Sequence, residues 1–431
     1  MSRYEAYKPS GIDWIGNVPE HWETVRIKNV ASIVNGSTPS SSVEEYWDGD
    51  IIWATPGDFN KYEKIIDDSE SKITEAGYKS CGTSLVPVGS VVITTRAPIG
   101  NVLIAGKELC TNQGCKTLVP NRIESRFLYY IISISSIELN VLGQGTTFLE
   151  LSKESLGTFK LPLPDFEDQL AIANYLDHQT QKIDCLIANK KAQAEKLKEL
   201  RQIEINNAVT KGLNPNAEMK DSGIEWLGKI PKHWDTKRIK QVANIETGNT
   251  PPMSDPENYS EEGLLWIKPD NLNDFEPLTE SAEYLSEKGA KLARIVRRGA
   301  ILVCCIGTVG KIGVAGKVLS TNQQINSIEF FNSIISDQYG KYLLYSMDKV
   351  HNYFSNKVVV AILNKINQGN IKLPIPPKKE QIEIANYLHQ RTTAIDQLIK
   401  NIEAQIEKLQ ELRKIKIYEA VTGKIKVNRY E

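Results

Sequence analysis

Apolar residues recur every seven positions in two stretches of the chain, residues 166–213 and 378–425. In the second stretch the first series is Leu388, Ile395, Ile402 and Leu409, and a companion series contains Leu398 and Leu412. In the first stretch the corresponding series are Leu176, Ile183 and Leu197, and then Leu186 and Leu200. Two apolar series at heptad spacing are typical of helices that pack in a coiled coil. The pattern therefore predicts two helices of about forty residues, each about 60 Å long.

Sequence signals mark both ends of each predicted helix. Prolines in FKLPLP (159–164) and IKLPIP (371–376) prevent a helix from starting before Phe166 and Lys378. At the other ends, matching Ala-Val-Thr tripeptides precede Gly212 and Gly423, which suit helix C-caps. Polar residues that interrupt the apolar series can fix the register and the choice of partner helix; they are Lys190, Gln193 and Gln405. We expect the two helices to pack against each other antiparallel, and the alternative is that each packs on its own domain.

Short apolar runs alternate with glycine and proline turns in the remaining sequence. In residues 1–165 the strand-like runs are Asp50–Trp53, Ser90–Thr95 and Asn101–Ala105. In residues 214–377 they are LLWIKP, AILVCCIG, KIGVAGK and STNQQINSIEF. Each range is therefore predicted to form one mixed α/β domain.

The whole pattern is duplicated. Residues 11–40 and 223–252 match at a shift of 212 positions, with roughly half of the paired residues identical, and residues 161–201 match 373–413 at the same shift. This period is far longer than the roughly 20–50 residues of a solenoid repeat. The predicted fold class is α+β, with two homologous domains joined by two long helices in an antiparallel coiled coil of pseudo-two-fold symmetry. Two similar surfaces related in this way suit another two-fold object, and duplex DNA is the leading candidate.

Composition limits the class of protein only weakly. The 52 basic and 53 acidic residues give a net charge of −1, which lowers the expectation of tight, independent DNA binding and leaves local basic patches or DNA held by partners. No apolar run is long enough to cross a membrane, and MSRYEAYKPSGIDW has no apolar core of a secretory signal. The six cysteines form no C-x-x-C pair, so we expect free thiols and a cytoplasmic location.

Catalytic signatures are missing from the sequence. It contains no G-x-x-x-x-G-K-[ST] loop, no H-E-x-x-H, no G-x-S-x-G and no cysteine–histidine cluster of zinc spacing. The glycine-rich stretches IGTVGKIG and LGQGT lack phosphate-loop spacing and read as turns. We therefore expect a chain that is not an enzyme and binds no cofactor or metal of its own.

Several motifs together resemble the specificity subunit of type I restriction–modification systems. They are SGIDWIGNVPEHWE and its second copy SGIEWLGKIPKHWD, the LP-x-P segments, and the stretches that begin each helix, where FEDQ in the first copy departs from KKEQ in the second. The resemblance extends over nearly the whole chain. It implies the order target-recognition domain (1–165), spacer helix (166–213), target-recognition domain (214–377) and spacer helix (378–425).

The resemblance also implies partners. Each domain would read one half of a split, asymmetric target in double-stranded DNA, and the paired helices would set the gap between the halves. Two modification subunits, which use S-adenosylmethionine to methylate adenine, and two restriction subunits, which use ATP and Mg²⁺, would dock on the chain. Because most of the domain interior differs between the copies, we expect two unlike half-sites.

Candidate DNA-contacting residues are polar side chains in turns that follow strand-like runs, since such side chains read base edges. In the first domain they are Thr38, Ser40, Thr55, Asp58, Arg96, Asn112, Gln113, Gln144, Thr146 and Thr147. In the second they are Thr250, Lys268, Asp270, Asn271, Thr308, Lys311, Gln323, Gln324, Asn326, Lys357 and Asn364. Pairs that recur in both copies, such as Thr38 and Thr250, suit a turn-forming role equally well.

Two alternatives stay open at this level. The basic run Lys288, Lys291, Arg294, Arg297 and Arg298 could bind phosphates or form a solvated helix face. The whole chain could instead be a structural coiled-coil adaptor with two protein-binding heads, which suits its neutral charge.

Overall fold

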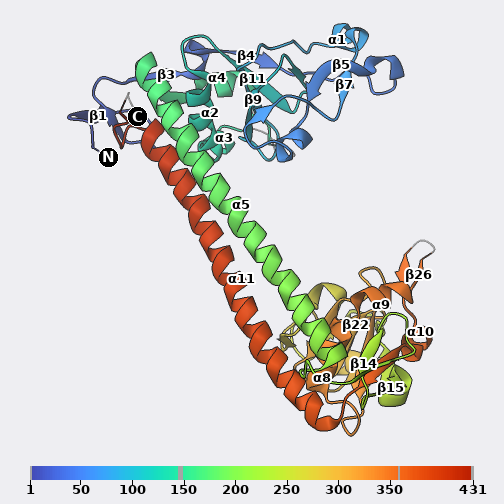
Figure 1. Ribbon diagram of the computed structural model, residues 1–431. Coiled ribbons are helices and arrows are strands. Elements are labelled where there is room, and N and C mark those ends of the chain that lie inside the picture. Colours follow the sequence, from blue (N-terminus) through green and yellow to red (C-terminus); the bar gives the residue numbers. More distant parts are fainter. Residues whose placement is uncertain (1, 144–148, 358–359, 429–431) are drawn as a thin grey trace. The chain divides into compact units, whose positions relative to one another are not determined.

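The computed structural model describes residues 2–143, 149–357 and 360–428, apart from the side chain of Lys357 (Figure 1). Its contacts divide the chain into two compact units. Unit 1 comprises Met1–Lys190 and Ala404–Glu431, and unit 2 comprises Lys191–Glu403. The two long helices, α5 (Phe166–Lys211) and α11 (Lys378–Val421), each begin in one unit and end in the other.

The centre of unit 1 is a five-stranded sheet with the order β4-β11-β8-β9-β6. Its strands are β4 (Ala31–Asn35), β6 (Ile65–Ile66), β8 (Val91–Thr94), β9 (Val102–Ala105) and β11 (Cys115–Pro120), and only the β6–β9 pair is parallel. The other strands of this unit are β1 (Tyr7–Pro9), β2 (Asn17–Pro19), β3 (Glu23–Arg26), β5 (Trp47–Ala54), β7 (Lys72–Ile73), β10 (Cys110–Thr111) and β12 (Lys160–Leu163). Its short helices are α1 (Glu75–Ser80), α2 (Ser125–Ser133), α3 (Ser136–Val141) and α4 (Lys153–Thr158).

Unit 2 repeats this sheet strand for strand, with the order β16-β25-β22-β23-β19. These strands are β16 (Ala243–Thr247), β19 (Pro277–Leu278), β22 (Ile301–Cys304), β23 (Ile312–Ala315) and β25 (Ile325–Phe330). The remaining strands are β13 (Met219–Asp221), β14 (Lys229–Pro231), β15 (Asp235–Arg238), β17 (Tyr259–Ser260), β18 (Leu264–Ile267), β20 (Tyr284–Leu285), β21 (Ile295–Val296), β24 (Leu319–Thr321), β26 (Asn356–Lys357), β27 (Ala361–Ile362) and β28 (Lys372–Ile375). The short helices are α6 (Ile239–Val242), α7 (Glu287–Leu292), α8 (Asp337–Tyr345), α9 (Asp348–Tyr353) and α10 (Lys365–Asn370). The predicted duplication is thus confirmed in the strand order.

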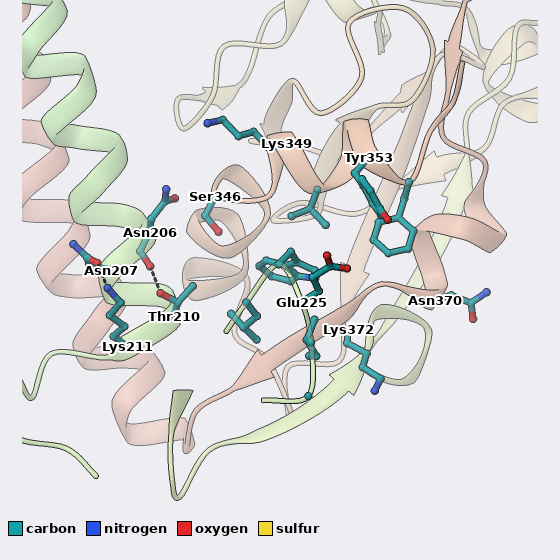
Figure 2. A pocket seen from close by; sticks show the side chains of 16 residues that line it. Asn206, Asn207, Thr210, Lys211, Glu225, Ser346, Lys349, Tyr353, Asn370 and Lys372 are labelled. Carbon is teal, nitrogen blue, oxygen red and sulfur yellow. Dashed lines mark hydrogen bonds between the residues drawn. The ribbon is translucent and has the colours of Figure 1, made fainter. Parts of the chain in front are cut away.

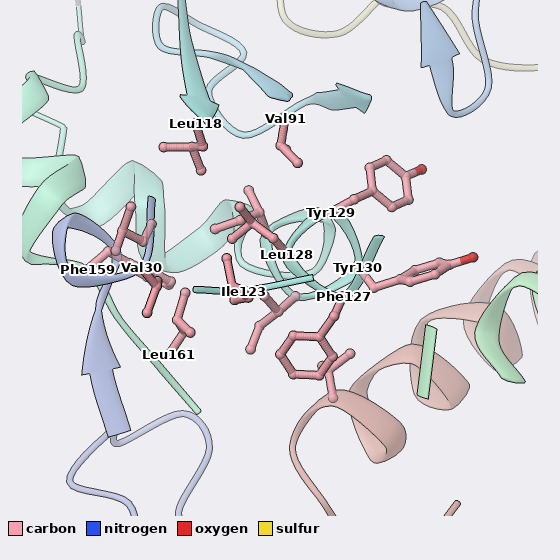
Figure 3. Packing of buried hydrophobic residues seen from close by; sticks show 14 of the residues in the cluster. Val30, Val91, Leu118, Ile123, Phe127, Leu128, Tyr129, Tyr130, Phe159 and Leu161 are labelled. Atoms are coloured by element: carbon pink, nitrogen blue, oxygen red, sulfur yellow. The ribbon is translucent and has the colours of Figure 1, made fainter. Parts of the chain in front are cut away.

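Each unit has its own hydrophobic core beneath the sheet. In unit 1, α2 lies in the centre of this core with Phe127, Leu128 and Tyr130 fully buried (Figure 3). Strand residues such as Val91 and Leu118 cover the helix. Alternation would leave one face of β8 polar, yet all four of its residues are buried, because the sheet is covered on both faces.

The two long helices pack against each other inside each unit, and they do so antiparallel. In unit 1 the Arg413 guanidinium of α11 pairs with the Asp184 carboxylate of α5 at 2.9 Å. In unit 2 the repeat mates of these residues, Arg201 and Asp396, make the same pair at 3.0 Å. The antiparallel packing of the fold-class prediction is therefore confirmed within each unit.

Within each unit, the ends of the two long helices also pack into the hydrophobic core of the domain. Ile172 and Leu176 near the start of α5 share the core of unit 1 with Ile417 and Val421 near the end of α11. The ends of both helices are closed by glycines of positive φ, Gly212 at 73° and Gly423 at 69°, which confirms the predicted C-caps. The two packing alternatives are thus not exclusive, because the helices contact each other and the domain.

The companion series of the heptad prediction is wrong by one residue. Leu186, Leu200, Leu398 and Leu412 are 49, 40, 50 and 39% exposed, whereas Ile187, Ala194 and Ile399 are buried. In the first series Leu176, Ile183, Leu388, Ile395 and Ile402 are buried, and Leu197 and Leu409 are half-buried. A second apolar series can follow the first at a spacing of either three or four residues, and both choices are apolar at Leu186 and Ile187 and at Leu398 and Ile399. The position of the neighbouring helix selects the spacing of four.

Among the described residues, no helix is both long and apolar enough to span a membrane.

Candidate nucleic-acid interface

Four loops of unit 1 meet at one edge of its sheets, where β4, β5, β8 and β10 end. These loops, residues 36–40, 55–60, 95–101 and 112–114, are called loop face 1. The indole nitrogen of Trp53 donates to the carbonyl oxygen of Ser37 at 2.9 Å, and the amide of Asn112 donates to that of Ala54 at 3.0 Å. The amide of Thr95 donates to the carbonyl oxygen of Gly114 at 2.8 Å. Backbone bonds therefore hold loops that are far apart in sequence in one continuous face.

Unit 2 builds loop face 2 in the same way from residues 248–253, 268–271, 305–311 and 322–324. The indole nitrogen of Trp266 donates to the carbonyl oxygen of Asn249 at 3.4 Å, and the amide of Asn322 donates to that of Ile267 at 3.0 Å. The amide of Cys305 donates to the carbonyl oxygen of Gln324 at 2.7 Å. Both tryptophans are buried and anchor the first loop of each face.

A glycine lets the first loop of each face approach the last. A Cβ atom on Gly36 would lie 1.9 Å from the carbonyl oxygen of Asn112, and one on Gly248 would lie 2.1 Å from the Thr321 hydroxyl. A side chain at either position would therefore separate the loops. Beside each glycine, a threonine and a glutamine bond to each other, Thr38 to Gln113 and Thr250 to Gln323.

Most predicted contact residues lie on these faces. Those with exposed side chains are Thr38, Ser40, Arg96, Gln113, Asp270, Thr308 and Gln323. Those with half-buried side chains are Thr55, Asn112, Thr250, Lys268, Asn271, Lys311 and Gln324. Gln144, Thr146 and Thr147 and the side chain of Lys357 lie outside the described residues. Asn364 is exposed and caps α10 by accepting from the amide of Asn367 at 2.8 Å.

Two predicted contact residues have buried side chains and present nothing at the faces. Asp58 is buried, and its carboxylate accepts from the amides of Thr55 at 2.8 Å and Glu70 at 3.2 Å. Asn326 is fully buried, and its amide group donates to Leu363 and Gln368. Their polar groups satisfy the backbone of tight turns and buried loops, a role that the sequence pattern does not distinguish from DNA reading.

Acidic residues missed by the sequence prediction pair with cations of both faces. The Arg96 guanidinium lies 3.2 Å from the Glu150 carboxylate, and the Lys268 ammonium pairs with Glu283. Lys311 donates to the carbonyl oxygen of Pro269 at 3.1 Å. Because these partners are distant in sequence, no local motif reveals them. The faces therefore present amides and hydroxyls beside Arg96 and Lys268, which pair with carboxylates, and beside Lys311, which forms no ion pair with a described residue.

The basic run of unit 2 is largely paired within the protein. Arg297 makes a bidentate ion pair with Asp337 at 2.7 and 2.9 Å. Lys288 lies 2.8 Å from Asp255, and Arg294 lies 3.2 Å from Glu246. These three side chains therefore form ion pairs within their own domain. The sequence had suggested either phosphate binding or a solvated helix face.

The buried cysteines do not suit nucleophilic chemistry. Burial raises the pKa of Cys110 to about 11 and the pKa of Cys115 and of Cys305 to about 12. A thiol with so high a pKa stays protonated near neutrality and is a poor nucleophile. Within the described parts of the chain, no three histidine, cysteine or carboxylate residues are grouped to hold a metal ion.

Comparisons with known proteins agree with this architecture. Residues 19–196 and 231–408 match the type I restriction modification DNA specificity domain. The specificity subunit of the type I restriction enzyme MjaIX of Methanocaldococcus jannaschii is 36% identical over 56% of this chain and 55% of its own length. The MjaVIII specificity subunit of the same organism is 25% identical over 95% of this chain and 94% of its own length.

Solved structures show the same fold. One chain from a study of complex assembly and conformational transition of the type I R-M system has a TM-score of 0.73 at 18% identity, covering 95% of this chain and 99% of its own. The HsdS subunit from Thermoanaerobacter tengcongensis has a TM-score of 0.50 at 17% identity, covering 95% of this chain and 98% of its own.

Two copies of one α+β domain, each presenting a loop face on a preserved frame, define a duplicated recognition protein. The chain belongs to the family of type I restriction modification DNA specificity domains, of which it contains two. Its relatives are named specificity subunits, which agrees with the expectation that this chain is not itself an enzyme.

Proposed function

We propose that this chain is the DNA-specificity subunit of a type I restriction–modification enzyme, with loop faces 1 and 2 each reading one half of a bipartite target. The proposal rests on one observation: the two units share the same backbone framework, whereas residues of their loop faces differ. The strand order, the face glycines and the Thr–Gln pairs recur in both units. Other residues of the loops differ, with Thr55 replaced by Lys268 and Arg96 by Ile306 in the second copy. Faces that differ on a common scaffold are expected to read two unlike half-sites.

Amide and hydroxyl side chains on the faces suit contacts to base edges in the major groove. Glutamine and asparagine pair with adenine, and each good bidentate contact discriminates against the wrong base by about 1–3 kcal/mol. Because Arg96 and Lys268 pair with carboxylates of the chain and the chain carries no net positive charge, most phosphate contacts would come from partner subunits.

The long helices offer equivalent docking surfaces for two copies of one partner. In unit 1 exposed apolar side chains lie near the Arg413–Asp184 pair in sequence, namely Leu186, Leu412 and Ile415. In unit 2 their repeat mates Leu398, Leu200 and Ile203 are exposed beside the Arg201–Asp396 pair. Exposed apolar groups that recur on an equivalent frame mark a binding surface. We assign these two sets, called the helix patches, to two modification subunits, with two restriction subunits joining that complex.

The test is selection from random duplex DNA by the purified chain bound to its modification subunit. A bipartite motif with a fixed gap is expected. Arg96→Ala should relax one half of the motif, and Lys268→Ala, on the other face, should relax only the other half. The proposal fails if neither half changes or if no sequence is enriched.

The alternative is a non-catalytic adaptor with two protein-binding heads, which the neutral charge favours. Complex formation with no enrichment of any DNA sequence would support the adaptor.

A further inference from the structure

Unit 2 contains a groove that lies outside loop face 2. It has a volume of about 730 Å³ and lies between the end of α5, the segment 223–227 and α9 (Figure 2). Three aromatic side chains line it, those of Trp226, Tyr353 and Phe354. The Tyr353 side chain is 77% exposed although it packs edge-on against Phe354 at 5.3 Å. Such exposure of an aromatic ring inside a concave surface marks a place where another molecule binds.

The charges around the groove are mainly positive. Lys211, Lys349 and Lys372 line it, and of the lining residues that the structure describes only Glu225 is acidic. Lys211 donates to the side-chain oxygen of Asn207 at 3.0 Å, whereas Lys349 and Lys372 form no ion pair with a described residue. The groove therefore favours an occupant that carries negative charge next to an aromatic group.

The corresponding place in unit 1 shows which group fits. There Trp14, the repeat mate of Trp226, packs on Tyr418 with ring centroids 6.3 Å apart, and the Tyr418 hydroxyl donates to the carbonyl oxygen of Trp14 at 3.2 Å. In unit 2 the position of Tyr418 is taken by Asn206, which cannot supply a ring. Unit 1 thus fills internally, with a tyrosine, a place that unit 2 leaves open.

A second side chain completes the filling in unit 1. The Lys424 ammonium donates to the carbonyl oxygens of Ile15 at 2.9 Å and Asn17 at 2.6 Å. Lys424 follows the cap glycine Gly423, and the residue that follows the equivalent cap glycine of unit 2, Gly212, is Leu213, whose side chain has no donor. The two units therefore differ here at two positions: Asn206 stands where unit 1 has Tyr418, and Leu213 stands where unit 1 has Lys424.

We infer that the groove of unit 2 docks a segment of the modification subunit that carries an aromatic side chain flanked by acidic residues. The aromatic ring packs on Trp226 as Tyr418 packs on Trp14, and the acidic residues lie against Lys349 and Lys372. This inference rests on the proposed function. Because Tyr418 occupies the corresponding place beside Trp14 in unit 1, two modification subunits that share the helix patches make unequal contacts with the chain.

The first experiment fills the groove from within. Asn206→Tyr restores the residue that unit 1 uses, and thermal unfolding checks that the variant is folded. The purified modification subunit is titrated into each chain, and the two dissociation constants are measured. The wild-type chain is expected to bind two copies with unequal affinity, and Asn206→Tyr to weaken the tighter step at least tenfold while changing the other less than twofold. The double variant Lys349→Glu with Lys372→Glu should weaken the same step.

The second experiment identifies the occupant. A photo-crosslinking amino acid at position 353 should join the chain to one peptide of the modification subunit that contains an aromatic and acidic residues. The same amino acid at Leu292, an exposed position on α7, serves as the control.

The outcomes separate the two proposals. If no modification subunit binds, both the proposed function and this inference fail. If it binds but Asn206→Tyr leaves both steps unchanged, or if position 353 crosslinks no more than position 292, only the groove assignment fails.

Discussion

Two adjacent residues on α11 separate the stability of the helix pair from the docking of a partner. Ile399 is buried near the point where Arg201 of α5 pairs with Asp396, whereas Leu398 is half exposed. Replacing Ile399 by alanine removes buried methyl and methylene groups and leaves a cavity, which costs about 2–4 kcal/mol. Replacing Leu398 by alanine should change the free energy of unfolding by no more than about 0.5 kcal/mol, as is usual at exposed positions.

Differential scanning calorimetry of the whole chain measures the difference. A unit of the size of Lys191–Glu403 loses roughly 2–4 °C in Tm for each kcal/mol. The apparent Tm of unit 2 should therefore fall by about 4–15 °C in Ile399→Ala and by less than about 2 °C in Leu398→Ala. Titration of the modification subunit should show the reverse order, with weaker binding for Leu398→Ala because that side chain belongs to a helix patch.

The repeat mates Ile187 and Leu186 provide an internal control in unit 1. Ile187→Ala should lower stability and Leu186→Ala should weaken docking, as in unit 2. Equal loss of Tm for Leu398→Ala and Ile399→Ala would refute the corrected seam. Normal docking by Leu186→Ala and Leu398→Ala together would refute the assignment of the patches.

Three further predictions follow from other parts of the chain. His351 is fully buried without a hydrogen-bond partner among the described residues, and burial lowers its pKa to about 4. In the unfolded chain the same imidazole binds a proton near pH 6.5, whereas in the folded chain it stays neutral down to about pH 4. The free energy of unfolding should therefore fall by about 3 kcal/mol as the pH drops from 6.5 to 4. His351→Leu should remove that part of the pH dependence in chemical unfolding curves, and an unchanged slope would contradict it. The indole nitrogen of buried Trp22 has no partner among the described residues, whereas the indole nitrogen of its repeat mate Trp234 donates to Glu380 at 2.9 Å. Asp168→Glu, which copies Glu380, should supply a hydrogen bond of about 0.5–1.5 kcal/mol and so raise the Tm. A lower Tm would count against this prediction. Removing one heptad from each long helix, residues 189–195 and 401–407, shortens each by about 10 Å, and the preferred gap between half-sites should shrink by about three base pairs in a binding selection; an unchanged gap at unchanged affinity would rule out a spacing role.

Local signals predicted the framework of this protein well. Prolines, the Ala-Val-Thr ends and the glycine caps marked the two long helices, because each acts on the backbone within a few residues. The predicted strand-like runs lie in β5, β8 and β9 and in their unit 2 counterparts. The duplication, read from the repeated motifs alone, also implied that both domains share one strand order.

The side of each helix that packs against its neighbour could not be predicted in this way. Leu398 and Ile399 are both apolar and adjacent, so periodicity permits either as the second series. Only the place of α5 and of the domain beside α11 determines that Ile399 is buried. The same applies to Asp58 in a turn and to Asn326 in β25, which are polar and yet lie in the interior.

The sequence by itself determined that this chain has two related domains, two long helices and an absence of familiar catalytic motifs, since repeats, periodicity and motifs are properties of the linear order. The tertiary structure decided which polar residues share a loop face, which cations Glu150 and Glu283 neutralise, and which apolar side chains remain exposed. It also decided that a Trp–Tyr contact closes unit 1 while Asn206 leaves the matching groove of unit 2 open. These features depend on contacts between residues distant in sequence, where burial and charge pairing are set by neighbours that no local pattern contains.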